Sequence, residues 1–229
     1  MTGIIGAMDI EVDGIKAELT DREVKTIAGL DFCRGKLNGA DVVVARCNPG
    51  KVNAAACAQI MALEYSPELI INPGVAGGIG EGIKLGDLVI GTSCIQHDMD
   101  TSALGDEVGF ISGINIKELP CDRAVSEKIR DFAEPLYEGR VHSGIIVTGD
   151  RFIGDSETGK MLREKFGAVA CEMESGAIAH VCYMNSIPFV ALRSISDNGD
   201  DGAAVDYMSF CRSAAEKTIK LMNSCIGKI

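Results

Sequence analysis

The stretch "VACEMESGAIAHVC", residues 169–182, contains a transition from strand to helix that decides the fold. Its first residues form a short apolar run typical of a buried strand, whereas Ala177 and Val181 share one face at helical spacing. Glu172 and Glu174 interrupt the apolar stretch, and a buried carboxylate is costly unless it is paired, hydrogen-bonded or protonated. We therefore expect these glutamates either to have partners in the fold or to bind a ligand.

The same alternation of apolar runs and helical segments continues along the rest of the chain. The runs at 68–80 and 141–154 are typical of buried strands that end in glycine-containing loops. The alanine-rich segment 50–66 and the tail from Asp206 have the spacing of helices. Such alternation is typical of an α/β fold whose sheet is covered on both faces.

A tight turn inside residues 32–47 adds an antiparallel element to this fold. The pair Asn38-Gly39 predicts a hairpin there, so part of the sheet is expected to be antiparallel. No linker, repeat or low-complexity segment divides the chain, which predicts one domain over residues 1–229. The expected fold is therefore a single α/β domain with a mixed sheet.

The composition favours a globular protein that binds neither nucleic acid nor membranes. The 229 residues are 46% hydrophobic and carry a formal net charge of −11, and a negative surface repels nucleic-acid phosphates and anionic lipids. The chain starts without a basic region before Asp9, so no signal peptide is predicted, and no apolar run reaches the length of a membrane span. We expect a cytoplasmic protein.

The spacing of cysteines and histidines argues against disulfides and metal sites. The nine cysteines are odd in number and contain no C-x-x-C pair, and Cys47, Cys57 and Cys182 lie in apolar runs. Buried free thiols are the expected state in a reducing compartment. The three histidines have no spacing with the cysteines that is typical of a metal site. We expect no metal and no cofactor.

Acidic side chains recur at the ends of the expected strands, where open α/β sheets bind their ligands. Carboxylates accept hydrogen bonds from hydroxyl groups, and aromatic and thioether groups pack against flat rings, so this combination suits a sugar joined to a ring. Glu174 also begins the expected helix of the opening stretch, where the helix dipole favours negative charge. The candidates are Met8, Glu11, Val75, Ala76, Phe152, Glu172, Met173, Glu174 and Asp197.

Several of these residues also have purely structural interpretations. Met173 and Phe152, taken singly, are more often core residues, and Glu11 at the start of a helix can be explained by the helix dipole alone. The glycine-rich run 76–82 lacks both the G-x-G-x-x-G spacing and the lysine of a phosphate-binding loop. A phosphate cradle is therefore not expected in this run.

Motifs in order along nearly the whole chain resemble the bacterial 5'-methylthioadenosine/S-adenosylhomocysteine nucleosidases of the nucleoside phosphorylase superfamily. These motifs are "GIIGAMDIEV", "NPGKVNAAA", "INPGVAGG", "GDLVI", "QHDMD", "VTGDRFI", "CEMESGAIAHVC" and "PFVALRSISD". The resemblance implies a three-layer α/β/α domain with a mixed, partly barrel-like sheet, assembled as a homodimer. It also implies hydrolysis of the N-glycosidic bond of both nucleosides, which releases adenine with 5-methylthioribose or S-ribosylhomocysteine in methionine salvage.

The resemblance assigns one group of residues to the adenine ring. Asp197 resembles the general acid that protonates N7 of adenine, and Ser196 the residue that orients it. Phe152 resembles the ring that stacks on adenine, and the Ile153 backbone the group that reads its Watson–Crick edge. The acid is needed because adenine is a poor leaving group as an anion, so a proton must arrive as the glycosidic bond breaks.

A second group is assigned to the sugar and the attacking water. Met173 and Glu174 resemble the ribose contacts, with Glu174 holding the hydroxyls. Glu11 resembles the residue that positions and activates the water, with Arg193 nearby. Carboxylates in these places would stabilise the positive charge that develops on the ribose.

A third group is assigned to the 5'-substituent of the nucleoside. Met8 and Tyr207 match positions that line the 5'-alkylthio pocket, which a loop around Leu104 of the partner subunit would complete. Val75 and Pro49 depart from the usual pattern of the family, and Val75 removes a polar contact near the sugar. Thr101 and Leu104 vary the wall that the partner's loop would form. The preferred 5'-substituent is where this chain is expected to differ from its relatives.

The nucleophile separates a hydrolase from a phosphorylase. A phosphate dianion needs arginines or a glycine-rich cradle, but Asn72-Pro73 supplies no positive charge and Arg193 alone beside Glu11 is a poor phosphate site. Water is therefore the expected nucleophile. The alternatives are a purine nucleoside phosphorylase, a nucleosidase for another 5'-modified adenosine such as 5'-deoxyadenosine or aminodeoxyfutalosine, and a nucleoside-binding protein without activity.

Overall fold

The computed structural model describes residues 1–138 and 140–229, and its strands form one mixed sheet. The strands are β1 (Thr2–Gly6), β2 (Thr20–Ile27), β3 (Leu30–Leu37), β4 (Ala40–Arg46), β5 (Leu69–Gly78), β6 (Leu88–Gln96), β7 (Leu119–Pro120), β8 (Val141–Thr148), β9 (Ala168–Glu172) and β10 (Phe189–Asp197). The helices are α1 (Asp9–Ala17), α2 (Lys51–Tyr65), α3 (Arg123–Leu136), α4 (Ser156–Phe166), α5 (Ser175–Met184) and α6 (Ala203–Cys225), with a 3-10 turn η1 (Ser102–Leu104). The α/β class expected from the sequence is confirmed.

Part of the sheet closes into a barrel of five strands. The strand order is β10-β6-β8-β9-β5-β1-β4-β3-β2, and β10 also pairs with β5, which closes the ring. Within the ring, β5 is parallel to β10 and antiparallel to β9. Outside it, β1 and β4 are parallel, whereas β2, β3 and β4 form an antiparallel ribbon. The mixed, partly barrel-like sheet that the resemblance implied is present.

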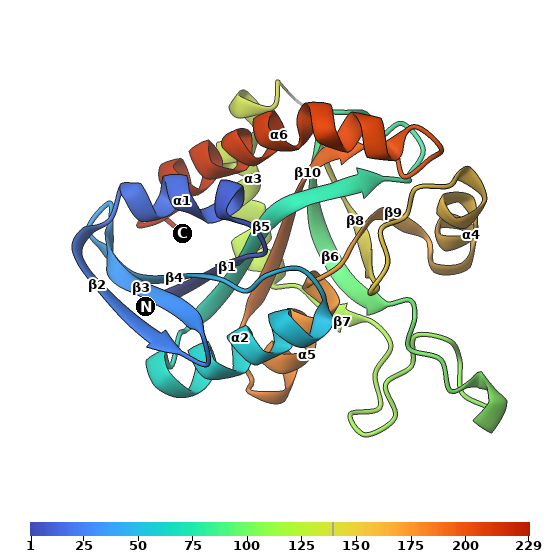
Figure 1. Cartoon of the computed structure of the whole chain (residues 1–229), viewed down its shortest axis with the longest axis horizontal. Helices are drawn as coiled ribbons and strands as arrows, with labels where there is room; N and C mark the ends of the chain where they lie inside the picture. The colour runs from blue at the N-terminus through green and yellow to red at the C-terminus, as the bar shows by residue number, and fades with distance from the viewer. Residues whose placement is uncertain (139) are drawn as a thin grey trace.

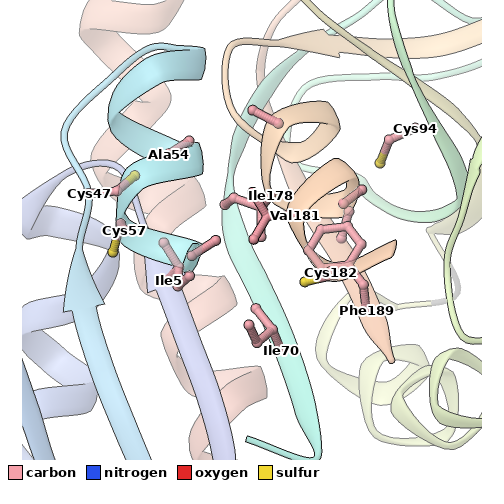
Figure 2. Close-up of a cluster of buried hydrophobic side chains, with 14 of the residues drawn as sticks. Ile5, Cys47, Ala54, Cys57, Ile70, Cys94, Ile178, Val181, Cys182 and Phe189 are labelled. Atoms are coloured by element: carbon pink, nitrogen blue, oxygen red, sulfur yellow. The ribbon is translucent and has the colours of Figure 1, made fainter. Parts of the chain in front are cut away.

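Helices cover both faces of the sheet (Figure 1). Helices α1, α3 and α6 lie along one face, and α2 packs against α5 on the other. Figure 2 shows the core beside α2 and α5, where Cys57 and Ile178 of these helices belong to one buried cluster with the strand residues Ile5, Ile70 and Phe189. Because both faces are covered, the central strands have continuous apolar runs in the sequence.

The strand boundaries agree with the sequence in some places and differ in others. The hairpin is confirmed, since Asn38 and Gly39 join β3 to β4 with positive φ angles of 51° and 83°. The sequence does not predict β2, because all but its last residue are exposed and no apolar alternation marks it. Strand β5 continues through the glycine motif as far as Gly78, where a loop was expected. Helix α6 begins at Ala203, before the expected Asp206.

Candidate active site

A cavity of about 380 Å³ lies at the ends of β1, β5, β9 and β10, beside the first turns of α6. The pairing of β5 with β10 explains how distant segments meet here, because it sets Val75 beside Ser194 and Gly77 beside Asp197. The cavity therefore lies where open α/β folds bind their ligands. The predicted residues that line it are Met8, Glu11, Val75, Ala76, Phe152, Glu172, Met173, Glu174, Ser196, Asp197 and Tyr207.

Glu11 is held in place by backbone amides from two segments. Its carboxylate accepts hydrogen bonds from the amides of Ala7 (2.7 Å) and Met8 (2.9 Å) and from the Val75 amide (3.1 Å). Burial raises the pKa of Glu11 above its usual value, and the nearby Arg193 and the three amides oppose this rise. A fixed carboxylate with a raised pKa is suited to take a proton from a water molecule.

The glycines of the "NPGVAGG" motif make room for carboxylates. A Cβ atom at Gly74 would lie 2.9 Å from Oε1 of Glu11 and 3.2 Å from Nη1 of Arg193. A Cβ atom at Gly77 would lie 2.8 Å from Oδ1 of Asp197. Both distances to carboxylate oxygens are too short for a real side chain, so these two glycines admit the acids of the site. The space that these glycines leave free is therefore occupied by side chains of the protein itself.

Glu172 is paired within the fold. Its Oε2 accepts hydrogen bonds from Nη2 of Arg193 (2.5 Å) and from the amides of Glu174 (3.0 Å) and Ser175 (2.8 Å). Its Oε1 accepts a hydrogen bond from the Thr148 hydroxyl. Burial alone would raise the pKa of Glu172, but Arg193 and these donors outweigh it and lower the pKa. Glu172 therefore caps α5 as a carboxylate, and the predicted substrate contact is not needed to explain its burial.

Arg193 lies one layer behind the cavity. Its side chain is 1% exposed, and it is not among the residues that line the cavity. Its Nη1 donates to the Asn72 carbonyl (2.7 Å), and its Nη2 donates to Oδ1 of Asn72 (2.5 Å) and to the Ser175 hydroxyl (2.7 Å), in addition to Glu172. Both terminal nitrogens are thus engaged by the protein. Arg193 therefore supports Glu172 and Glu11 from behind the cavity. Its predicted place near the attacking water is indirect, because it acts through these carboxylates.

Glu174 is held more loosely than Glu172. Among the described residues, its carboxylate accepts one hydrogen bond, from the Gly50 amide to Oε1 (2.9 Å). Burial and the neighbouring Glu172 raise the pKa of Glu174 to about 8, although Arg193 and the Gly50 amide lower it. Glu174 therefore has unused acceptor capacity directed at the cavity, which a hydroxyl-bearing ligand would fill.

Asp197 ends β10 and lines the same cavity as Glu11. Its Oδ2 accepts a hydrogen bond from the Ser196 hydroxyl (2.9 Å), and its Oδ1 accepts one from the Gly199 amide (3.0 Å). The carboxylate is buried, and this burial raises its pKa above the usual value against the effect of the two donors. Asp206 and Asp200 add a smaller rise. A raised pKa lets an aspartate carry the proton that a general acid must deliver.

Comparison with known proteins identifies the family. The chain matches the family model described as "Phosphorylase superfamily" over residues 2–227. A curated relative from Shewanella loihica, named 5'-methylthioadenosine/S-adenosylhomocysteine nucleosidase, is 38% identical over 98% of this chain and 97% of its own length. The chain belongs to the 5'-methylthioadenosine/S-adenosylhomocysteine nucleosidase family. The resemblance inferred from the motifs is thereby confirmed.

Solved structures of a nucleosidase of this family and of a futalosine hydrolase share the fold. The 5'-methylthioadenosine/S-adenosylhomocysteine nucleosidase of Neisseria meningitidis, in complex with methylthio-immucillin-A, has a TM-score of 0.95 and 32% identity and covers 100% of this chain and 99% of its own. A futalosine hydrolase mutant from Helicobacter pylori strain 26695 has a TM-score of 0.93 and 29% identity, with coverage of 100% and 99%. The nucleoside phosphorylase-like fold class is confirmed.

The mouth of the nucleosidase cavity is apolar and partly open. Phe152 is 45% exposed, and its ring meets Tyr207 edge-on with centroids 5.6 Å apart. The Tyr207 hydroxyl donates to the sulfur of Met8 (3.1 Å), which joins the three side chains into one wall. The Ile153 side chain is buried outside the lining residues, so its predicted role rests on its backbone.

The sequence did not single out two further residues of this wall. Ala204 and Met208 line the cavity from the first turns of α6, on either side of Tyr207. Ala204, Tyr207 and Met208 stand at positions i, i+3 and i+4 of one helical face, and this spacing was the signal that could have found the two residues. Within residues 1–138 and 140–229, no group of three or more histidine, cysteine or acidic side chains is arranged to hold a metal ion.

Proposed function

We propose that this chain hydrolyses the N-glycosidic bond of 5'-methylthioadenosine and S-adenosylhomocysteine. The observation that carries this proposal is the arrangement of Glu11, Glu174 and Asp197 around one cavity, each with a pKa above its usual value. Membership of the nucleosidase family supports the substrate class. The products would be adenine and either 5-methylthioribose or S-ribosylhomocysteine.

The proposed mechanism divides the reaction among a general acid, a general base and a carboxylate that contacts the sugar. Asp197 donates its proton to N7 of adenine as the bond to the ribose breaks, and the bonding electrons leave with the base. Glu174 accepts hydrogen bonds from the ribose hydroxyls and stabilises the positive charge on the sugar. Glu11 takes a proton from the water that attacks this cation. The proton lost by Asp197 and the one gained by Glu11 balance, and exchange with solvent restores both groups.

Water is favoured over phosphate as the nucleophile by the bonding of Arg193. A phosphate dianion needs donors that are not already used. Both terminal nitrogens of Arg193 donate to protein acceptors, and Glu11 presents negative charge on the cavity side. The phosphorylase alternative is therefore weaker. Another 5'-modified adenosine is a second candidate substrate, because a futalosine hydrolase from Helicobacter pylori has the same fold. Val75 and Pro49, which line the cavity, would select between the 5'-substituents.

The remaining proposals concern the surroundings of the enzyme. We infer that residues 1–229 act as a single domain in the cytoplasm, and that two copies associate so that Leu104 of each reaches the neighbour's cavity. Leu104 is 85% exposed on η1, a segment that extends away from the sheet (Figure 1), which supports this assembly. In the described part of the chain, no helix combines the length and the apolar character that crossing a membrane requires.

Adenine release from 5'-methylthioadenosine, measured with and without phosphate, tests the proposed function. We expect equal release under both conditions, with free methylthioribose as the second product. Asp197→Asn is the negative control, since its amide cannot donate the proton, and we expect it to bind substrate but to lose about 10²–10⁴-fold in kcat. Release only with phosphate would make the chain a phosphorylase. No release from this nucleoside, with release from another 5'-modified adenosine, would change the substrate.

A further inference from the structure

The loop between β4 and α2 makes a direct contact with the sugar side of the cavity. The Gly50 amide donates to Oε1 of Glu174 (2.9 Å), and Pro49 beside it lines the cavity. Gly50 has a φ angle of +97°, in the region that favours glycine. A Cβ atom there would lie 3.2 Å from Oδ1 of Asp150, a tight contact that would push on this aspartate. The position of the amide therefore depends on what holds the loop.

Three charged residues outside the cavity hold this loop, and we call Lys51, Asp98 and Asp150 the loop anchor. Oδ1 of Asp150 accepts a hydrogen bond from the Lys51 amide (2.7 Å), next to Gly50. The Lys51 ammonium donates to Oδ1 of Asp98 (2.6 Å), and Oδ2 of Asp98 accepts from the Asp150 amide (3.0 Å). The triangle is closed, because each member bonds to the other two.

The loop anchor connects three elements at one edge of the sheet. Asp98 follows β6, Asp150 follows β8, and Lys51 is the first residue of α2. Burial would raise the pKa of Asp98, but the Lys51 ammonium and the Asp150 amide outweigh it and hold the pKa below its usual value. None of the three residues is among those that line the cavity, so we expect them to act on a bound substrate through the loop.

We propose that Asp150, through the loop anchor, is a positioning residue that fixes the Gly50 amide on Glu174 and thereby orients the carboxylate that receives the ribose hydroxyls. This inference rests on the proposed function of Glu174. It gives the "VTGDRFI" motif a second task, because Phe152 of the same motif lines the cavity while Asp150 holds the opposite loop.

The protonation of Glu174 reports on the loop anchor. The Gly50 amide is one of the groups that lower the pKa of Glu174, so its loss raises this pKa further. If the negative charge of Asp150 or Asp98 were removed and the loop did not move, the pKa of Glu174 would fall instead, because fewer nearby anions favour its ionised form. The charged and titratable groups that face Glu174 are Glu172 on β9, Arg193 on β10, Glu11 on α1, Cys47 after β4 and Tyr207 on α6.

The pH dependence of kcat/KM in Asp150→Ala tests the inference. If the substrate needs Glu174 as a carboxylate, kcat/KM rises with pH as Glu174 loses its proton. We expect this acidic limb to move to higher pH in Asp150→Ala by about half a pH unit to one pH unit, the effect of one lost amide hydrogen bond. KM for 5'-methylthioadenosine is expected to rise about two- to tenfold. Asp150→Asn keeps the acceptor oxygen for the Lys51 amide, and its acidic limb is expected at the wild-type position or slightly below it.

Two further variants separate positioning from loss of charge or of stability. Asp98→Asn removes a charge and weakens the anchor, so an upward shift of the limb supports positioning and a downward shift overturns it. Asp122→Ala is the matched control, because Asp122 caps α3 by accepting a hydrogen bond from the Val125 amide (2.9 Å) and is not among the residues that line the cavity. A shift in this control equal to that in Asp150→Ala overturns the inference. Wild-type protein without any adenine release contradicts the proposed function, whereas active wild type with an unmoved limb in Asp150→Ala contradicts only the positioning role.

Discussion

At the scale of single residues, burial gives the two glutamates of the opening stretch opposite states. Glu172 has an ionic partner in Arg193 and several hydrogen-bond donors, so it is a structural carboxylate with a lowered pKa. Glu174 has the Gly50 amide and a pKa raised to about 8, so it is left for the ligand. Glu174 is thus buried without the partners that would stabilise its charge, which leaves it able to bind the substrate. We expect this burial to lower the free energy of unfolding measurably.

Glu174→Gln is expected to stabilise the protein at neutral and alkaline pH. Between the usual value of 4.5 and about 8, the native state holds a proton on Glu174 that the unfolded state releases, so stability falls as pH rises through this window. Glutamine keeps an oxygen for the Gly50 amide and has no charge to bury. We expect a gain in unfolding free energy on the order of 3 kcal/mol at pH 8, and little gain at pH 5, by urea unfolding.

The same substitution is expected to lower adenine release, since the sugar contact loses its negative charge. Glu164→Gln is the control, because Glu164 is an exposed partner of Lys160 on α4 (3.8 Å), and its removal is expected to change stability little at either pH. A Glu174→Gln protein no more stable than wild type at pH 8 would mean that the native state accommodates the charged carboxylate.

At the scale of helices and strands, local patterns predicted many of the elements, though not β2, and they did not predict how the strands pair. The hairpin at Asn38-Gly39 and the strand-to-helix junction at 169–182 each carry their signal within a few residues. Closure of the barrel depends on β5 pairing with β10, more than a hundred residues away, and no local pattern encodes that contact. The inward position of Arg193 was hidden for the same reason, because Asn72, its acceptor, lies on β5.

The junction of β9 with α5 is expected to depend on the charge of Glu172. Glu172→Gln leaves the Arg193 guanidinium buried without an anion and weakens the cap of α5, and breaking a buried ion pair in this way costs about 3–5 kcal/mol. Urea unfolding at pH 7 measures this loss. Because the folded pKa is lowered, the stabilisation by Glu172 is present above the usual value of 4.5 and is lost as pH falls through the folded pKa, so the two proteins converge in acid.

Glu127→Gln is the control for the charge change at the junction. Glu127 pairs with Arg123 on the surface of α3 (2.7 Å), where both side chains are well exposed. Exposed pairs of this kind contribute about 0–1 kcal/mol. A loss in Glu172→Gln no larger than in this control would mean that Glu172 does not support the junction.

At the scale of the whole molecule, the cavity is open on the side where its wall is apolar. Met208 is 80% exposed and Phe152 is 45% exposed, although both line the cavity. Leu104 of η1, also highly exposed, is not among the residues that line this cavity in its own chain. Exposed apolar groups that gather at one place, as Phe152 and Met208 do at this cavity, are typical of surfaces that another molecule covers. The proposed dimer covers both at once, with Leu104 of one copy against the wall of the other.

Mixing two defective variants tests whether the neighbour completes the site. Leu104→Ser is expected to raise KM for 5'-methylthioadenosine, since it removes apolar contact from the neighbour's cavity, and Asp197→Asn is expected to lack turnover. In a mixed dimer, one cavity has both an intact Asp197 and an intact Leu104 from the partner. After co-expression and purification through two tags, we expect that cavity to recover the wild-type KM at about half the wild-type kcat per dimer. A mixed dimer that keeps the raised KM of Leu104→Ser would place Leu104 outside the neighbour's site, and mixed protein that sediments as monomers would remove the dimer itself.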